Sequence, residues 1–267
     1  VYKRQRRVWA RRQWRNMLFT PVLLMLALFC SASYVSAEDA VRSQQLHYGA
    51  IWMVTVLVTI VGGRIIPLFT GNRLGNKVPP LPAAFEYSVI GITALIGLAF
   101  AAIPWQEAPR WLGALCLLGA LLHGIRLLRW QGWRTLRIPL LWSLHLCYAC
   151  IPLALLGLGL SAGDGNLGKN LMHLLAVVSV GGMILAVMSR VALAHTGRPL
   201  EVPLYISLAY GAIVVAAQLR SIGAREFPDL ALVHWRIAAL LWIVAFTLFL
   251  WRYLPILTTP RADGKPG

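Results

Sequence analysis

The stretch 61-VGGRIIPLFTGNR-73 closes a long apolar segment with two glycines, an arginine, a proline and a Thr-Gly pair. The segment it closes, residues 46–69, is long enough to cross the hydrocarbon core of a bilayer, which takes about 20 apolar residues. Each closing residue suits such a helix. Glycines let neighbouring helices approach closely, proline removes a backbone donor, arginine reaches the lipid head groups, and glycine after threonine favours a helix end. The stretch therefore predicts one end of a membrane-spanning helix.

The whole chain has the same character. It has 267 residues, of which 58% are hydrophobic and only 13% are charged, outside the usual balance of soluble domains. We expect an all-α polytopic protein whose main partner is the lipid bilayer. Eight spans are predicted, at 17–36, 46–69, 84–103, 110–130, 138–160, 170–194, 203–222 and 232–254. The first of these also imitates a secretory signal with a cleavage site after Ala37, which is the alternative for that span.

The net charge of +16 follows the predicted topology. With eight crossings, 19 of the 25 lysines and arginines fall on the side that holds both chain ends. Because cytoplasmic loops collect basic residues, both termini are predicted to be cytoplasmic. The basic charge is therefore explained without a nucleic-acid partner, and none is predicted.

The chain contains an internal repeat with the pattern H-x16-R-x5-T-G. Its offset of 126 residues spans four crossings, so it predicts two parallel four-helix units, 1–130 and 131–267, within one membrane domain. Gly62-Gly63 and Gly181-Gly182 are predicted to bring helix backbones together, and Pro67 to bend or end its helix. The first copy comprises His47, Arg64, Thr70 and Gly71, and the second His173, Arg190, Thr196 and Gly197 followed by Arg198; both Thr-Gly pairs are predicted helix stops.

The two repeat arginines have two interpretations. Arg64 and Arg190 lie about four helical turns from their histidines, near the cytoplasmic boundary. They either extend to the lipid head groups or clamp a carboxylate or propionate, which suits the guanidinium fork. Spacing alone favours the first interpretation.

The histidines fall into two layers. His123 and His145 flank the loop near Trp133, so an antiparallel hairpin places them at similar depth, where they can face each other. Imidazole suits haem iron and copper, so this pair predicts a haem or copper site, although a neutral histidine hydrogen-bonded between helices is the alternative. His195 lies at the cytoplasmic end of its span. The outer layer comprises His47, His173 and His234, which are candidate metal ligands.

Other side chains add little chemistry. Cys147 and Cys150 form a CYAC pair on one helix face, which is more typical of packing than of a metal clip. Glu86, near a helix end, is the one carboxylate inside a span, whereas proton- or sodium-coupled carriers usually need one at mid-membrane. No phosphate-binding loop or hydrolase motif is present. No catalytic residue can be assigned.

Three stretches resemble the NnrS family of bacterial inner-membrane proteins: GGRIIPLFT from Gly62, RWQGWRTLRIPLLWSLHLCYA from Arg129, and HLLAVVSVGGMILAVMSRVALAHTGRPL from His173. The resemblance runs from about residue 46 to 200. It implies haem b and copper, a role in the response to nitric oxide, and a location in the bacterial inner membrane. It gives no secure ligand assignment. Family members are longer and carry an upstream histidine-rich unit, so the chain is expected to be an N-terminally truncated member.

The expected function is therefore that of a haem- and copper-binding membrane protein of the nitric oxide response. His123, His145, His173, His195, Arg64 and Arg190 are the candidate cofactor-binding residues. Turnover, sensing and simple binding of nitric oxide all stay open. Two alternatives come from other classes: a metal or small-molecule permease with a site between the repeats, and a non-catalytic assembly partner of respiratory-chain proteins.

Overall fold

The computed structural model describes residues 17–75, 78–162 and 164–264, and over these residues the chain is helical without any strand. Within these described ranges, seven helical segments are long and apolar enough to cross a membrane. The predicted first span forms a shorter apolar helix of 17 residues, α3 (Phe19–Val35). The all-α polytopic fold is thus confirmed, with seven helices of spanning length where eight were expected.

The helices follow one another with short connections. They are α4 (Ala40–Leu74), α5 (Ala83–Ala102), η1 (Trp105–Glu107), α6 (Arg110–Arg129), η2 (Gly132–Thr135), α7 (Pro139–Leu160), α8 (Gly165–Leu174), the π-helical η3 (Leu175–Gly182), α9 (Met183–His195), α10 (Leu204–Gln218), the π-helical η4 (Leu219–Gly223), α11 (Ala224–Glu226), η5 (Pro228–Leu230) and α12 (Ala231–Thr258). The elements α8, η3 and α9 together form one span, as do α10, η4 and α11.

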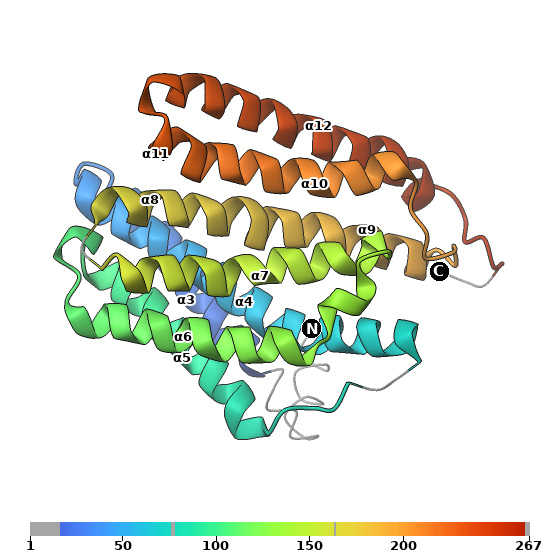
Figure 1. The fold of residues 1–267 in the computed structure, drawn as a ribbon, viewed down its shortest axis with the longest axis horizontal. Helices are drawn as coiled ribbons and strands as arrows, with labels where there is room; N and C mark the ends of the chain where they lie inside the picture. The colour runs from blue at the N-terminus through green and yellow to red at the C-terminus, as the bar shows by residue number, and fades with distance from the viewer. Residues whose placement is uncertain (1–16, 76–77, 163, 265–267) are drawn as a thin grey trace.

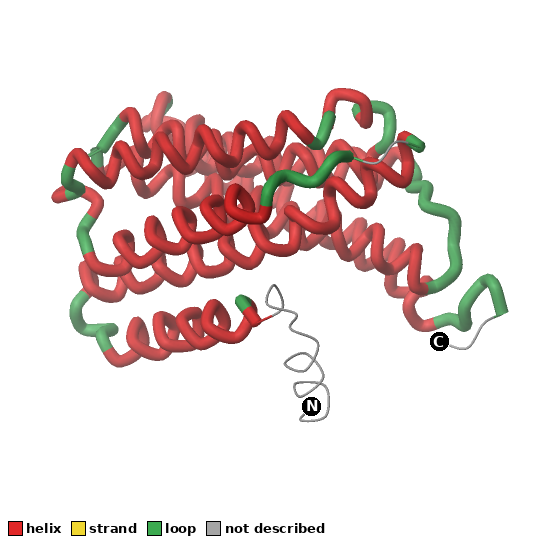
Figure 2. Tube along the Cα trace, turned by 90° about the horizontal axis from the view of Figure 1, so that it is seen from below, coloured by secondary structure: helices red, strands yellow, loops and turns green. Residues whose placement is uncertain are grey.

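The long helices lie side by side as one bundle (Figures 1 and 2), with α12 and α10 along one edge (Figure 1). Helices that follow each other pack together, as α4 does with α5, α6 with α7, and α10 with α12. The largest buried cluster includes Trp52, Phe100, Tyr148 and Val178, so one apolar core joins helices from before and after residue 130. The division into two repeated units remains a prediction.

The end of α4 corrects the prediction for the opening stretch. Pro67, Thr70 and Gly71 all lie inside α4, which continues to Leu74 and ends at Gly75 with φ of +70°. Thr70 and Gly71 are buried against neighbouring helices, whereas Gly75 is exposed. The left-handed backbone conformation is therefore adopted at Gly75. Because Gly75 is exposed, ending the helix there disrupts no packing between helices.

The second Thr-Gly pair ends its helix as predicted. Gly197 has φ of +67°, and its N–H donates to the carbonyl of Ala194 while that of Arg198 donates to the carbonyl of Leu193. This is the Schellman arrangement of a helix C-terminus. The last carbonyls are covered by the tail of the chain, because Arg261 donates to His195 O at 2.8 Å. Arg198 itself donates to Thr259 Oγ1 at 2.8 Å and so joins the ends of α9 and α12.

The glycine pairs do not bring helix backbones together as predicted. A Cβ on Gly62 would meet the ring of Tyr148, and one on Gly181 would meet the ring of Trp242, so these glycines make room for side chains. A close backbone approach occurs instead between α6 and α7. There a Cβ on Gly113 would lie 3.2 Å from the carbonyl oxygen of Gly159, and one on Gly159 would lie 3.0 Å from that of Gly113.

Candidate functional site

A buried arginine organises the polar interior of the bundle. Arg126 belongs to the last turn of α6, and its side chain is 1% exposed. Its Nη1 donates to the carbonyl oxygen of Thr59 at 2.9 Å and to the hydroxyl of Tyr148 at 2.8 Å. Its Nη2 donates to a carboxylate oxygen of Glu86, which lies in the first turn of α5. One cation thus joins α4, α5, α6 and α7, and its charge is balanced by a carboxylate.

The hydrogen bonds beyond Arg126 fix the state of His123. Because arginine only donates, the Tyr148 oxygen accepts from Arg126 and its proton points to His123 Nδ1, 2.8 Å away. At the other side of the ring, Thr93 gives its hydroxyl proton to Val89 O, so it accepts from His123 Nε2 at 2.9 Å. Both deductions assign the neutral imidazole with its proton on Nε2. We define Glu86, Arg126, Tyr148, His123 and Thr93 as the Arg126 network.

Gly63 leaves the space that the Arg126 guanidinium occupies. A Cβ on Gly63 would lie 1.6 Å from Arg126 Nη2 and 2.4 Å from its Cζ. The Trp130 ring lies 5.4 Å from the same guanidinium carbon and packs edge-on against Tyr148. A side chain at position 63 could be accommodated only by moving the guanidinium, which would break its hydrogen bonds.

His145 is bonded differently from His123. Its Nδ1 lies 2.9 Å from the carbonyl oxygen of Leu141, one helical turn earlier, so that nitrogen donates. Its Nε2 has a longer contact of 3.4 Å with Thr70 Oγ1. Trp130 lies beside the ring, with the two ring centres 6.4 Å apart. The predicted pair therefore lies around Tyr148 and Trp130, and each imidazole is bonded to other partners.

The outer histidines do not gather at one point. His47 is exposed, with Nδ1 2.7 Å from Ser43 O. His173 lies near the charge of Arg220, and His234 packs edge-on against Phe227. Across the described residues, no three His, Cys, Asp or Glu side chains come close enough to hold one metal ion. His195, also exposed, lies at the end of α9 beside the chain's tail.

The two repeat arginines have different surroundings. Arg190 is buried, and its guanidinium lies 4.0 Å from the centre of the Phe69 ring. Arg64 lies 5.8 Å from the Phe19 ring and lines a cavity. The structure thus places Arg190 in a cation–π contact between helices and Arg64 at a site large enough for a ligand.

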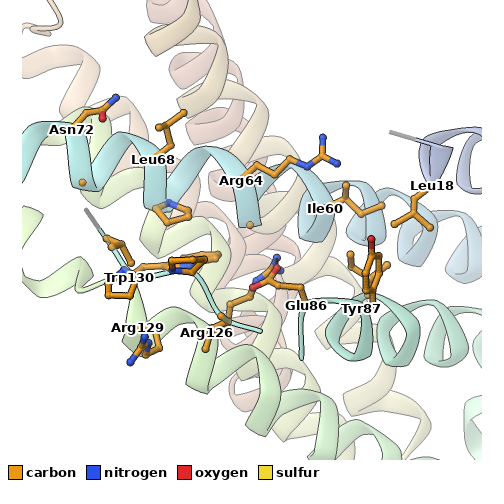
Figure 3. A pocket seen from close by; sticks show the side chains of 18 of the residues that line it. Leu18, Ile60, Arg64, Leu68, Asn72, Glu86, Tyr87, Arg126, Arg129 and Trp130 are labelled. Atoms are coloured by element: carbon orange, nitrogen blue, oxygen red, sulfur yellow. Dashed lines mark hydrogen bonds and ion pairs between the residues drawn. The ribbon is translucent and has the colours of Figure 1, made fainter. Parts of the chain in front are cut away.

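That cavity has a volume of about 700 Å³ and lies among the start of α3, the end of α4, the start of α5 and the end of α6 (Figure 3). Arg126 and Glu86 meet inside it, and Trp130 forms part of its wall. Among the described residues that line it there is no histidine, cysteine or methionine. Trp130, which forms part of the cavity wall, also packs beside the ring of His145.

The role of Arg126 could not be predicted from the count of basic residues, which treats it only as one of the 19 on the side of the chain ends. The structure instead buries it within α6, which continues to Arg129. A signal was present, because Arg126 follows His123 by three residues and therefore shares its helix face. The isolated carboxylate of Glu86 was the second signal, since an intramembrane charge needs a partner.

Comparison with known proteins gives one family. The profile of the family described as NnrS protein matches residues 1–261, which extends the resemblance seen at 46–200 in both directions. Neither the curated proteins nor the solved structures give a match. Since the profile covers nearly the whole chain, this protein belongs to the NnrS family, whose members are membrane proteins of the nitric oxide response.

Proposed function

We propose that this protein acts in the nitric oxide response by binding haem b or copper, with His145 as the ligand that this chain contributes. The arrangement of His145 supports the proposal. A metal-binding histidine usually donates its second ring N–H to a carbonyl or carboxylate, and His145 Nδ1 donates to Leu141 O. The Nε2 of this imidazole, which lies 3.4 Å from Thr70 Oγ1, is then the nitrogen that would hold the metal.

His123 does not fit the same role. Both of its ring nitrogens are in short hydrogen bonds, and the lone pair on Nδ1 already accepts from Tyr148. Binding a metal there would leave the Tyr148 hydroxyl without its acceptor. The ligand pair of His123 and His145 expected from the sequence is therefore replaced in the proposal by His145 alone.

The Arg126 network would keep the surroundings of His145 rigid. A haem iron or copper ion, when bound, supplies the one-electron redox centre at which nitric oxide binds. The network does not pass protons along its full length, because arginine stays protonated in proteins. Its task is to hold Tyr148 and Trp130 in position, and Trp130 packs against His145. The proposed site gives no role to five residues that the sequence had suggested: His47, His173, His195, His234 and Arg190.

The test is cofactor analysis of the full chain after expression with added haem and copper. Reduced-minus-oxidised optical spectra and copper content are measured for the wild type, for His145→Ala and for His47→Ala as an exposed control. The proposal predicts a haem b spectrum or bound copper in the wild type and the control, and its loss in His145→Ala. Retained solubility and helicity of each variant show that it has folded.

Two results would contradict the proposal. Cofactor retained in folded His145→Ala would exclude this ligand. A wild-type protein without haem and copper would exclude the cofactor, and accumulation of a substrate in vesicles would then favour the permease. Association with respiratory-chain proteins stays a prediction, which co-purification can test.

A further inference from the structure

The cavity beside the Arg126 network has the size of a ligand site. Its volume of about 700 Å³ falls within the roughly 300–1,000 Å³ of small-molecule sites. Apolar side chains from three helices, among them Leu18, Ile60 and Ile90, form part of its wall. A ligand here would therefore have an apolar part.

The charges in the cavity favour an anion. Arg64, Arg126 and Arg129 line it, against the one carboxylate of Glu86. Arg126 is 1% exposed, and its Nε is buried without a hydrogen-bond partner in the structure. A buried donor without an acceptor is unfavourable, so an incoming oxygen atom that accepted from it would be stabilised.

The position of the cavity near helix ends favours one kind of anion. Arg129 is the last residue of α6, and the cavity also contacts the start of α5, so the site lies at helix ends. Trp130 and Tyr87 line it too, and such aromatic residues are enriched at the level of the lipid head groups. Arginines and apolar residues thus line one cavity near these helix ends, a combination that would suit a phosphate with an acyl chain attached.

We propose that this cavity binds the phosphate group of an anionic phospholipid, with the arginines that line it supplying the positive charge and an acyl chain along Ile60 and Ile90. This inference goes beyond the proposed function, because the ligand requires neither a metal nor His145. A soluble phosphate would satisfy the same arginines but would leave the apolar wall unoccupied.

The test is native mass spectrometry of the detergent-purified full chain, titrated with phosphatidylglycerol and, separately, with phosphatidylcholine of the same acyl chains. Competition with inorganic phosphate forms a third arm. Arg129→Gln and Arg64→Gln remove one charge each from the cavity. Arg137→Gln is the matched control, because Arg137 is an exposed arginine that does not line the cavity.

We expect phosphatidylglycerol to bind at least about tenfold more tightly than phosphatidylcholine, in line with one charge-assisted hydrogen bond. The preference should shrink in both cavity variants and persist in Arg137→Gln. Equal binding of the two lipids, or an unchanged preference in the cavity variants, would overturn the proposal. Displacement of phosphatidylglycerol by inorganic phosphate would assign the site to a soluble anion and overturn the lipid assignment.

Discussion

At the scale of single residues, the burial of the Arg126 charge depends on partners from three other helices. A buried charge is costly in lipid unless it is paired and hydrogen-bonded, and removing one partner of such a pair costs about 3–5 kcal/mol. Glu86 supplies the opposite charge, and Thr59 O and the Tyr148 hydroxyl supply two further acceptors. The network therefore contributes to the specific packing of α4, α5, α6 and α7.

Tyr148→Phe tests the shared hydroxyl. The substitution leaves the ring in place but removes one of the two acceptors of Arg126 Nη1 and the donor to His123 Nδ1. We expect a loss of about 1–3 kcal/mol, seen as a lower apparent unfolding temperature in detergent. Tyr34→Phe, at a side chain that is 84% exposed, is the control. An unchanged temperature for Tyr148→Phe would show that the hydroxyl contributes nothing to stability.

At the scale of helices, the two Thr-Gly pairs differ, because one ends its helix and the other lies inside its helix. Thr196-Gly197 is followed by Arg198 and Pro199, and since proline cannot continue a helix, the chain turns away there. Thr70-Gly71 is followed by residues that can stay helical, so α4 ends four residues later. The positions of the helices could be predicted from apolar length, whereas their ends depend on the neighbours that cover the last turn.

Gly197→Ala tests the cap of α9. Alanine is strained at φ of +67°, and its Cβ would also lie 2.6 Å from the Asp263 carboxyl carbon. We expect a loss of about 1 kcal/mol or more in the free energy of unfolding, measured by denaturant titration in detergent. Gly91→Ala is the matched control, since its Cβ would meet no neighbouring atom and alanine favours a helix. A Gly197→Ala variant as stable as Gly91→Ala would contradict the assigned cap.

At the scale of the whole molecule, the basic residues predict how the bundle sits in the membrane. Trp133, exposed between α6 and α7, is predicted to lie on the cytoplasmic side, and Glu107, exposed before α6, on the opposite side. In a chain without its four native cysteines, a membrane-impermeant maleimide added to intact cells should label Glu107→Cys and not Trp133→Cys. Lysed cells provide the control, in which both should react. The reverse pattern would contradict the predicted cytoplasmic termini.

The sequence predicted the membrane fold and the family but not the connections of the candidate site. His123 and His145 were placed correctly in one region, because a helical hairpin fixes relative depth. Their hydrogen bonds could not be predicted, since they involve Thr93 and Thr70 from helices far along the chain. Glu86 and Arg126 are 40 residues apart, and only packing brings them together.

Gly63 leaves the space that the Arg126 guanidinium occupies, and a double-mutant cycle tests this contact most directly. Gly63→Ala is measured in the wild type and in Arg126→Leu, with apparent unfolding free energies determined in the same detergent. We predict that the alanine destabilises the wild type but has little effect beside leucine, with a coupling of about 1–3 kcal/mol. Equal destabilisation in both backgrounds would contradict this role of Gly63, because the cost of the alanine would then be independent of the arginine.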